Sequence, residues 1–479
     1  MTRDDRAGAH GRLTETAALA ACALACALAF IAFPLNPAVR DSFVVAGLFR
    51  GLWCGLVGGL ALANASRARV GVSTAVGAVL GGIVVRLATR SIAVWVLVAS
   101  LVLAVVVALA VHELARRVGT RWAASAALVL VAVGLSWQIG LLPGPFAGPQ
   151  RQFLASVSQE PVAEHYDFDG KLFLKTMFLV KTGVPYYSAF QRAYVQDSRL
   201  TSTPPLKFNY REPWPARFVA LLPGNPGIDA WLVFLALVAA SGVGAYVLAS
   251  KFVTSGVALL GSMLLASYFA FPLATKWFPL IEFWAGALAV WVIAALVRER
   301  WWLAAAFLTV AVAMRELMIY LIPVMAIGWL LYPQRRKVWL PMAAAVVLPA
   351  LVLGYHFAVA PGAWGLGAGG GASAWLKGGL KALVAAMRFS DKYIVLGKLM
   401  MPALPVVAVL GAVQASGWWR KALLASTVVI PTIALAMLGN GVYGYYWGAI
   451  VQPIELSMVP LLFIVLLPAV AAKRDTVSA

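Results

Sequence analysis

The stretch that decides the fold is residues 301–333, WWLAAAFLTVAVAMRELMIYLIPVMAIGWLLYP. It is almost entirely apolar, and it is much longer than the roughly 20 residues with which an α-helix crosses the hydrocarbon of a bilayer. The charged pair Arg315-Glu316 interrupts it near the middle. We expect two short helices that meet at this pair instead of one long crossing.

The composition of the rest of the chain indicates a membrane protein. Of 479 residues, 62% are hydrophobic and only 12% are charged, whereas soluble domains carry about 25% charged residues. The net charge of +20 does not indicate nucleic-acid binding, because the basic residues form short clusters between apolar runs, as cytoplasmic anchors do. All three cysteines lie in apolar runs, which excludes a disulfide framework in the polar loops.

Positions of the basic clusters predict the topology. If residues 301–333 form two helices, every basic cluster falls on one side of the membrane, which the positive-inside rule identifies as the cytoplasm. This gives about fourteen transmembrane helices with both termini cytoplasmic, and it puts the polar stretch 143–227 and the glycine-rich stretch 359–393 outside. The clusters are Arg67 and Arg69, Arg116 and Arg117, Arg335 to Lys337, Arg420 and Lys421, and Lys473 and Arg474.

Ionisable residues inside the predicted spans fall in the outer half of each span. Such residues are costly in lipid, and they mark either function or ion pairing between helices. Their one-sided distribution favours a polar cavity that opens outward. The set is Arg50, Arg86, Glu282, Arg315, Glu316, His356 and Glu455.

The long outer loop 143–227 carries the most informative motif, His165-Tyr166-Asp167-Phe168-Asp169-Gly170, followed by Lys171 to Lys181. Apolar residues alternate there with lysines, a pattern typical of a helix at the membrane surface whose lysines reach phosphate headgroups. Asp169 is suited to cap the start of this helix. Asp167 has no capping role, and we interpret it as a functional carboxylate.

Two aromatic residues follow in the turn Gly183-Val184-Pro185-Tyr186-Tyr187. Tyr186 and Tyr187 are suited either to stack on a sugar ring or to anchor the loop at the membrane interface. The run Thr203-Pro204-Pro205-Leu206 and then Arg211-Glu212-Pro213-Trp214 lead into the next span.

With these motifs, residues 119–479 resemble membrane glycosyltransferases of the GT-C class. The features in common are an aspartate-bearing outer loop, a Gly-x-Pro-Tyr-Tyr turn, a Pro-Pro-Leu run and a later pair of half-spans broken by a basic residue. The resemblance implies an all-α, GT-C-like fold and a hexosyl- or pentosyltransferase of cell-envelope biogenesis in the inner (plasma) membrane. Its sugar donor would be a polyprenyl-phosphate sugar, and its acceptor an envelope glycan, lipid or protein.

The resemblance also implies roles for particular residues. Asp167 matches the loop carboxylate of the class and is the expected catalytic base, with Asp169 as its partner. A base takes the proton of the acceptor hydroxyl, and a guanidinium binds the departing phosphate through two hydrogen bonds. We assign the phosphate to Arg315 and Arg211. The remaining expected substrate-binding residues are Glu316, His165, Lys171, Tyr186 and Tyr187.

Two departures from the class leave alternatives open. Four extra spans in residues 1–118, whose role the sequence does not indicate, precede the GT-C-like part, which makes Asp41 in the first outer loop a rival base. Glu316 could neutralise Arg315 and weaken its phosphate role. No metal ligands are assigned, although a divalent metal between Asp167 and Asp169 stays open.

Two other functions compete with glycosyl transfer. A flippase or transporter of lipid-linked sugars fits the many spans and the cationic interior, and a glycan polymerase or ligase has a similar span count with its main outer loop later in the chain. An outward cavity in which Asp167 faces Arg315 favours the transferase. A cavity at the membrane midplane, closed on both faces, favours transport.

Overall fold

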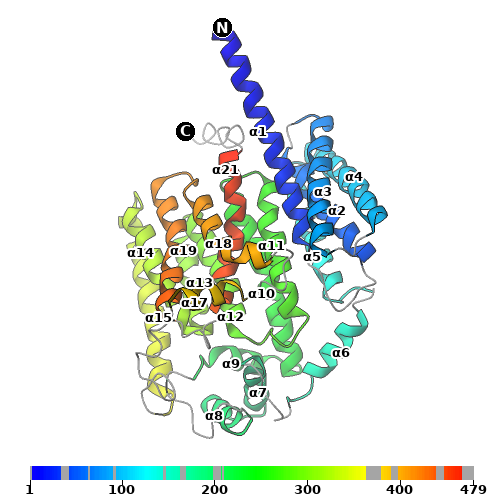
Figure 1. Ribbon diagram of the computed structural model, residues 1–479. Coiled ribbons are helices and arrows are strands. Elements are labelled where there is room, and N and C mark those ends of the chain that lie inside the picture. The colour runs from blue at the N-terminus through cyan, green and yellow to red at the C-terminus, as the bar shows by residue number, and fades with distance from the viewer. Residues whose placement is uncertain are drawn as a thin grey trace.

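A computed structural model of the chain describes residues 3–33, 43–62, 65–89, 93–143, 147–161, 169–197, 207, 210–362, 379–389, 397–438 and 447–466. Every regular element in these ranges is helical, as the composition predicts (Figure 1). The first nine helices are α1 (Arg3–Ala32), α2 (Phe43–Ala61), α3 (Arg67–Thr89), α4 (Val94–Val118), α5 (Thr120–Gln138), α6 (Ala147–Val157), α7 (Asp169–Lys181), α8 (Tyr186–Asp197) and α9 (Trp214–Leu221).

The second half of the chain continues as helices. They are α10 (Pro226–Ala249), α11 (Ser255–Leu273), α12 (Ile281–Val297), α13 (Trp301–Met314), η3 (Glu316–Tyr320), α14 (Leu321–Leu331), η4 (Arg335–Val338), α15 (Trp339–Val359), α17 (Gly379–Met387), α18 (Gly397–Ala412), α19 (Trp418–Leu438), α20 (Gly448–Met458), η6 (Val459–Leu462) and α21 (Phe463–Leu466).

The chain is a membrane-spanning protein. Among the described residues, eight helices are long and apolar enough to cross a bilayer, and six shorter apolar helices accompany them. Apolar side chains such as Val98, Val102 and Leu351 are exposed on α4 and α15, as expected for surfaces that face lipid. By contrast, α11 is almost completely enclosed by its neighbours, so it forms the centre of the bundle.

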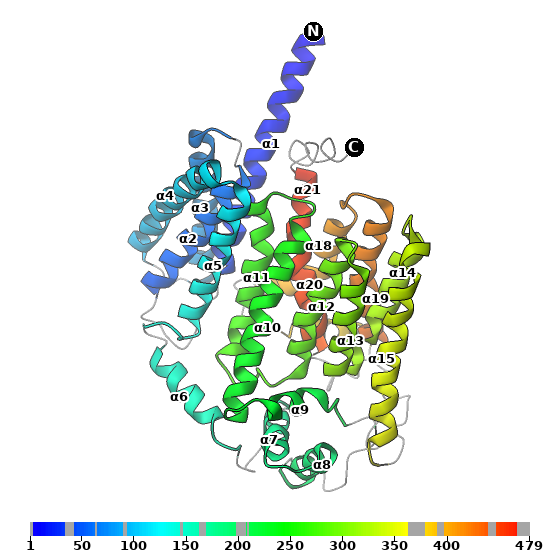
Figure 2. The same ribbon diagram turned by 180° about the vertical axis from the view of Figure 1, so that it is seen from behind.

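Helices α1 to α4 pack mainly against one another and form a bundle beside the rest of the protein (Figures 1 and 2). Gly51, Gly55 and Gly59 lie at intervals of four residues along α2. A Cβ atom at any of them would overlap a backbone carbonyl of α4. Small residues at this spacing let two membrane helices approach closely, where dispersion contacts stabilise the pair.

The segment 301–333 breaks where the sequence predicts. Helix α13 ends at Met314, Arg315 is extended with φ −149° and ψ 117°, and η3 and α14 follow. The two ends of this hairpin meet again, because the Tyr332 hydroxyl donates a hydrogen bond of 2.8 Å to Glu299 Oε2 and the rings of Trp301 and Tyr332 are 5.4 Å apart. The expectation of two short helices that meet at Arg315-Glu316 is therefore confirmed.

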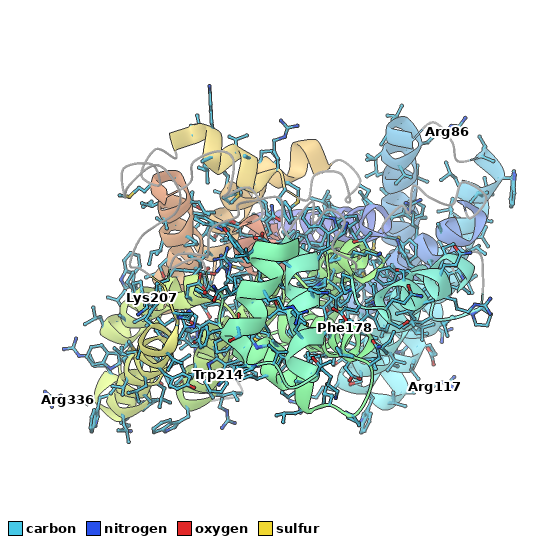
Figure 3. All side chains as sticks on the ribbon, turned by 90° about the horizontal axis from the view of Figure 1, so that it is seen from below. Arg86, Arg117, Phe178, Lys207, Trp214 and Arg336 are labelled. Atoms are coloured by element: carbon cyan, nitrogen blue, oxygen red, sulfur yellow. The ribbon has the colours of Figure 1, made fainter. Side chains whose placement is uncertain are left out.

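Helices α6 to α9 form a layer, here called the loop layer, across the end of the bundle opposite the start of α1 (Figure 1). Seen from that end, α7 and α8 lie across the middle of the molecule, and Phe178 and Trp214 belong to this layer (Figure 3). The loop layer is the part of the predicted outer loop 143–227 that the structure describes.

The expected helix after Asp169 is present as α7, but its environment differs from the prediction. Its apolar residues Leu172, Phe173 and Met177 are buried against protein. The ammonium groups also contact protein: Lys175 forms an ion pair with Glu160, and Lys181 donates to the main-chain carbonyls of Ala220 and Leu222. The periodicity predicted the helix correctly, but it could not distinguish a protein surface from a lipid surface, because both bury an apolar face.

Candidate functional site

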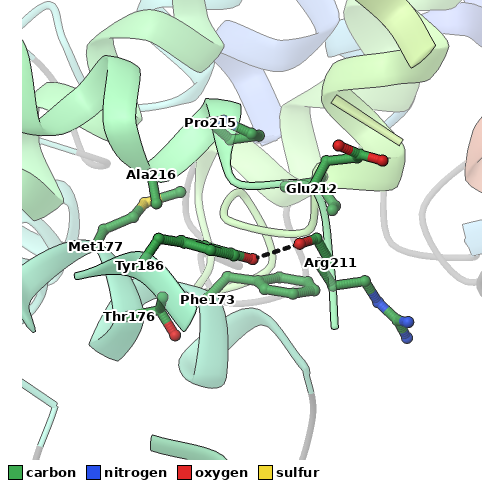
Figure 4. Close-up of a pocket in the computed structure, with 9 residues that line it drawn as sticks. Phe173, Thr176, Met177, Tyr186, Arg211, Glu212, Pro215 and Ala216 are labelled. Atoms are coloured by element: carbon green, nitrogen blue, oxygen red, sulfur yellow. Dashed lines mark hydrogen bonds between the residues drawn. The ribbon is translucent and has the colours of Figure 1, made fainter. Parts of the chain in front are cut away.

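A small pocket lies where the loop layer meets the first residue of α12 (Figure 4). Residues of α7, α8, α9 and α12 line it, together with the segment before α9. The lining is apolar except for Thr176, the Tyr186 hydroxyl, Arg211 and Glu212; the other members are Phe173, Met177, Pro215, Ala216 and Ile281.

Arg211 is held by its main chain and leaves its guanidinium at the edge of the pocket. Its carbonyl accepts a hydrogen bond of 2.7 Å from the Tyr186 hydroxyl. The guanidinium points away from the rings of Phe173 and Tyr186 (Figure 4), and its Nη2 atom lies 3.9 Å from Asp169 Oδ2. Asp169 is the first residue of α7, where the helix dipole favours a negative charge.

Glu212 is the most unusual side chain of the pocket. It is 2% exposed, and neither carboxylate oxygen has a hydrogen-bond partner within the ranges that the structure describes. Burial, helped by repulsion from Glu316 and opposed by Arg315, raises the pKa of Glu212 to about 9. At neutral pH its carboxyl group is therefore protonated and able to donate a hydrogen bond.

His356, near the end of α15, lies against Glu212. Its Nδ1 atom is 3.8 Å from Glu212 Oε2 and 3.0 Å from the Tyr187 hydroxyl. The same hydroxyl is 3.3 Å from the His356 carbonyl. These contacts join α8 of the loop layer to α15, and the direction of the bond to Nδ1 depends on the imidazole tautomer.

The aromatic pair is part of the protein interior. Tyr186 is 5% exposed and Tyr187 is 9% exposed, and burial raises the pKa of both phenols. Both hydroxyls are bonded to protein atoms, as described above. Stacking on a sugar and anchoring in lipid both remain predictions, and the contacts observed for the two rings are with protein.

Arg315 sits at the hairpin break and is almost completely buried, at 2% exposure. Its Nε atom lies 2.8 Å from Glu282 Oε1, and its Nη1 atom pairs with Glu316. The sequence analysis predicted that Glu316 could neutralise the charge of Arg315, and the structure shows this ion pair. Glu282 adds a second counter-charge. A direct contact with a phosphate would require these ion pairs to rearrange.

The charged residues act on one another as one group. Arg211 and Asp169 act electrostatically on Glu282, and Glu316 acts on Glu212. We call this group the charge cluster: Asp169, Arg211, Glu212, Glu282, Arg315, Glu316 and His356. It joins the loop layer to the hairpin break.

The sequence found part of this cluster. Asp169, Arg211, Arg315 and Glu316 were expected site residues and do come together, while Lys171 lies half-buried on α7. His165 and Asp167 lie outside the described residues. The role of Glu212 was missed, and the only signal for it was a carboxylate directly before the Pro-Trp start of α9.

Within the described ranges, no group of three or more His, Cys, Asp or Glu side chains is arranged to hold a metal ion. A divalent metal between Asp167 and Asp169 stays an open prediction because Asp167 lies outside those ranges. Comparison with known proteins gives no match to a protein family, a curated protein or a solved structure.

Proposed function

We propose that this chain is an integral membrane glycosyltransferase of GT-C type, acting on the extracytoplasmic side of the inner (plasma) membrane. In this proposal about fourteen helices enter the membrane, and both termini are cytoplasmic. The sugar passes from a polyprenyl-phosphate donor to an envelope glycan, lipid or protein acceptor. The observation that carries the proposal is the charge cluster, which joins the aspartate-bearing loop layer to the break at Arg315.

Arg211 is the better candidate for the donor phosphate. Its side chain is 18% exposed, and its ion pair with Asp169 is long at 3.9 Å. An incoming phosphate can replace a carboxylate at such a distance, because a guanidinium binds both groups in the same planar geometry. Arg315 has two close carboxylates and 2% exposure, so its proposed role becomes that of holding Glu282 and Glu316 in place.

Asp167 remains the proposed base. It precedes Asp169, the first residue of α7, by two positions in the sequence. In the reaction, Asp167 accepts the proton of the acceptor hydroxyl while that oxygen bonds to the anomeric carbon. The bond from the anomeric carbon to the lipid phosphate breaks, and the phosphate leaves with the electron pair beside Arg211.

The neutral Glu212, which lines the pocket, suits the recognition of uncharged sugar hydroxyls. A protonated carboxyl both donates and accepts hydrogen bonds. A sugar hydroxyl has the same two capacities, and an aromatic wall such as Phe173 suits the apolar face of a sugar ring. This part of the pocket is therefore proposed to hold a sugar, with the phosphate nearer Arg211.

The competing functions are less well supported. A transporter that works by alternating access needs its binding groups near the membrane midplane, whereas the charge cluster includes loop-layer residues. A polymerase or ligase is expected to carry its main outer loop later in the chain, whereas the loop layer precedes α10.

The proposal is tested by transfer from defined donors. The purified protein in nanodiscs is incubated with hexosyl and pentosyl polyprenyl phosphates and with envelope lipids and glycans, and products are detected by mass spectrometry. Asp167→Asn is expected to lower turnover by about 100-fold or more, the usual contribution of a positioned base. Arg211→Lys should mainly raise KM for the donor, because lysine lacks the planar pair of donors.

Arg117→Gln is the matched control, since Arg117 lies on α4 and 75% of its side chain is exposed. It should transfer sugar at the wild-type rate. If Asp167→Asn also retains that rate, the assignment of the base is wrong. If the wild type moves lipid-linked sugar across the bilayer without transferring it to an acceptor, the protein is a transporter and the proposed transferase function is wrong.

A further inference from the structure

Glu455 lies inside the helical bundle, on α20, and within the described part of the chain no ion pair or hydrogen bond engages its carboxyl group. The side chain has no exposed surface, and neither oxygen has a hydrogen-bond partner among the described residues. No ion pair found within the described ranges includes it. A carboxyl group in this position is unusual, because an unpaired charge is very costly in an apolar interior.

The other polar side chains of α20 do have hydrogen-bond partners, in contrast to Glu455. Gln452, about one turn earlier, donates 2.7 Å to the Met387 carbonyl, and the Ser457 hydroxyl donates 2.6 Å to the Pro453 carbonyl. The helix is also packed tightly, because a Cβ atom at Gly286 of α12 would overlap the Ala449 carbonyl. The bundle therefore satisfies the other polar side chains of this helix and leaves one carboxyl group unsatisfied.

Tyr320 connects this position to the hairpin break. It is the last residue of η3, which begins with Glu316 of the charge cluster. Its hydroxyl oxygen is buried without a hydrogen-bond partner among the described residues, and it interacts electrostatically with Glu455. An unsatisfied hydroxyl on η3 and an unsatisfied carboxyl group on α20 are therefore coupled.

We propose that Glu455 is a proton-binding site inside the bundle, protonated in this conformation and coupled to the hairpin break through Tyr320. A bound proton removes the charge that the apolar surroundings cannot compensate. When the proton leaves, the carboxylate needs a donor, and the unpaired Tyr320 hydroxyl is suited to supply it. Proton binding would then favour one arrangement of η3 and proton release another.

Other ionisable side chains on the helices packed against α20 do not compensate Glu455. Glu282 on α12 is engaged by Arg315. The remaining titratable groups on these helices are Asp229 and Tyr246 on α10, Tyr268 on α11, Lys381 on α17, and Arg420 and Lys421 on α19; the side chain of Lys398 on α18 lies outside the described set.

The test is spectroscopic and does not depend on any enzymatic activity. Infrared difference spectra compare the wild type with Glu455→Gln in nanodiscs at pH 6, and the wild type is expected to show a protonated-carboxyl band that the variant lacks. Dicyclohexylcarbodiimide, which adds to protonated carboxyls in apolar surroundings, is then applied and the peptides are mapped by mass spectrometry. An adduct is expected on Glu455 and not on Glu282, an equally buried carboxylate that has an ion-pair partner.

Tyr320→Phe tests the coupling. It removes a donor that can stabilise the ionised form, so the band of Glu455 should persist to higher pH than in the wild type. If Glu455→Gln does not fold, Glu455→Asp takes its place, since it keeps the carboxyl and moves the band. If no protonated-carboxyl band can be assigned to Glu455, the proposed proton-binding site is wrong, whatever the carbodiimide yield. If the Glu455 band disappears over the same pH range in Tyr320→Phe as in the wild type, the proposed coupling is wrong.

Discussion

Two arginines are buried in two regions of this protein, and their surroundings differ. Arg50, in the α1–α4 bundle, is fully buried, and the one hydrogen bond found for it among the described residues goes from Nη2 to the Phe33 carbonyl at 3.0 Å. Arg315, at the hairpin break, is paired with two carboxylates. The first is stabilised by the carbonyl end of helix α1, which carries partial negative charge, and the second by full counter-charges.

The difference indicates where chemistry can take place. A carbonyl at the end of a helix is fixed by the backbone, so it cannot move away from a guanidinium to make room for a ligand as a side chain can. Ion pairs between side chains can exchange a carboxylate for another anion. The α1–α4 bundle therefore has the character of a structural unit, whereas the charge cluster can rearrange around a ligand.

The largest expected effect tests the compensation of Arg315. Arg315→Leu leaves Glu282 and Glu316 as neighbouring carboxylates without their counter-charge, and the free energy of unfolding should fall by about 3–5 kcal/mol. Thermal unfolding in detergent at pH 7 measures it. The triple variant Glu282→Gln, Arg315→Leu, Glu316→Gln should recover most of the loss, and failure to recover it would show that packing, not charge, dominates.

A second effect concerns pH and follows from Glu212. Its pKa is raised to about 9, so the folded state keeps a proton that the unfolded state releases above its ordinary pKa near 4.5. Because the folded state binds more protons in this window, stability should fall as pH rises from about 5 to 9. Thermal unfolding across this range should show a weaker pH dependence in Glu212→Gln. Equal slopes in both proteins would contradict a buried neutral Glu212.

A third effect tests the close packing in the α1–α4 bundle. Gly55→Ala introduces a Cβ atom against the Ala104 carbonyl and should lower stability by about 1–3 kcal/mol, the usual cost of overpacking. Gly82→Ala is the control, because its Cβ would meet Leu97 at an ordinary 3.6 Å. A similar loss in both variants would point to helix propensity or lipid effects instead of packing.

The smallest effect is expected at Arg50. Arg50→Met removes a buried charge together with its hydrogen bond to the Phe33 carbonyl, and because no carboxylate in the described part of the chain pairs with Arg50, stability should change by about 1 kcal/mol or less. The stability changes of Arg50→Met and Arg315→Leu, measured under the same conditions, compare the two buried arginines directly. A loss at Arg50 as large as that at Arg315 would mean that Arg50 has a counter-charge and that the two regions are alike.

Much of the fold was predictable from the sequence because lipid imposes simple rules. Long apolar runs must become helices, since backbone groups find no water there, and the pair Arg315-Glu316 marked the hairpin break. The spacing of apolar residues after Asp169 likewise predicted α7. These inferences need only neighbouring residues along the chain.

The site was predictable only in part. Asp169, Arg211, Arg315 and Glu316 were singled out by charge in an apolar or motif-rich setting, and they do meet. The contact between Tyr187 and His356 joins residues 169 positions apart, and no local pattern predicts it. The burial of Glu212 likewise depends on helices that are remote in sequence.

The sequence by itself therefore determined that the chain is helical, crosses a membrane and breaks at Arg315, because each property follows from local hydrophobicity and charge. Only the tertiary structure decided which charges are paired, which carboxyl groups are buried without a hydrogen-bond partner and which helices pack against α7. The physical reason is that solvation and pairing depend on every group within a few ångströms. For Glu212 and Glu455, those surroundings come from helices far apart in the chain.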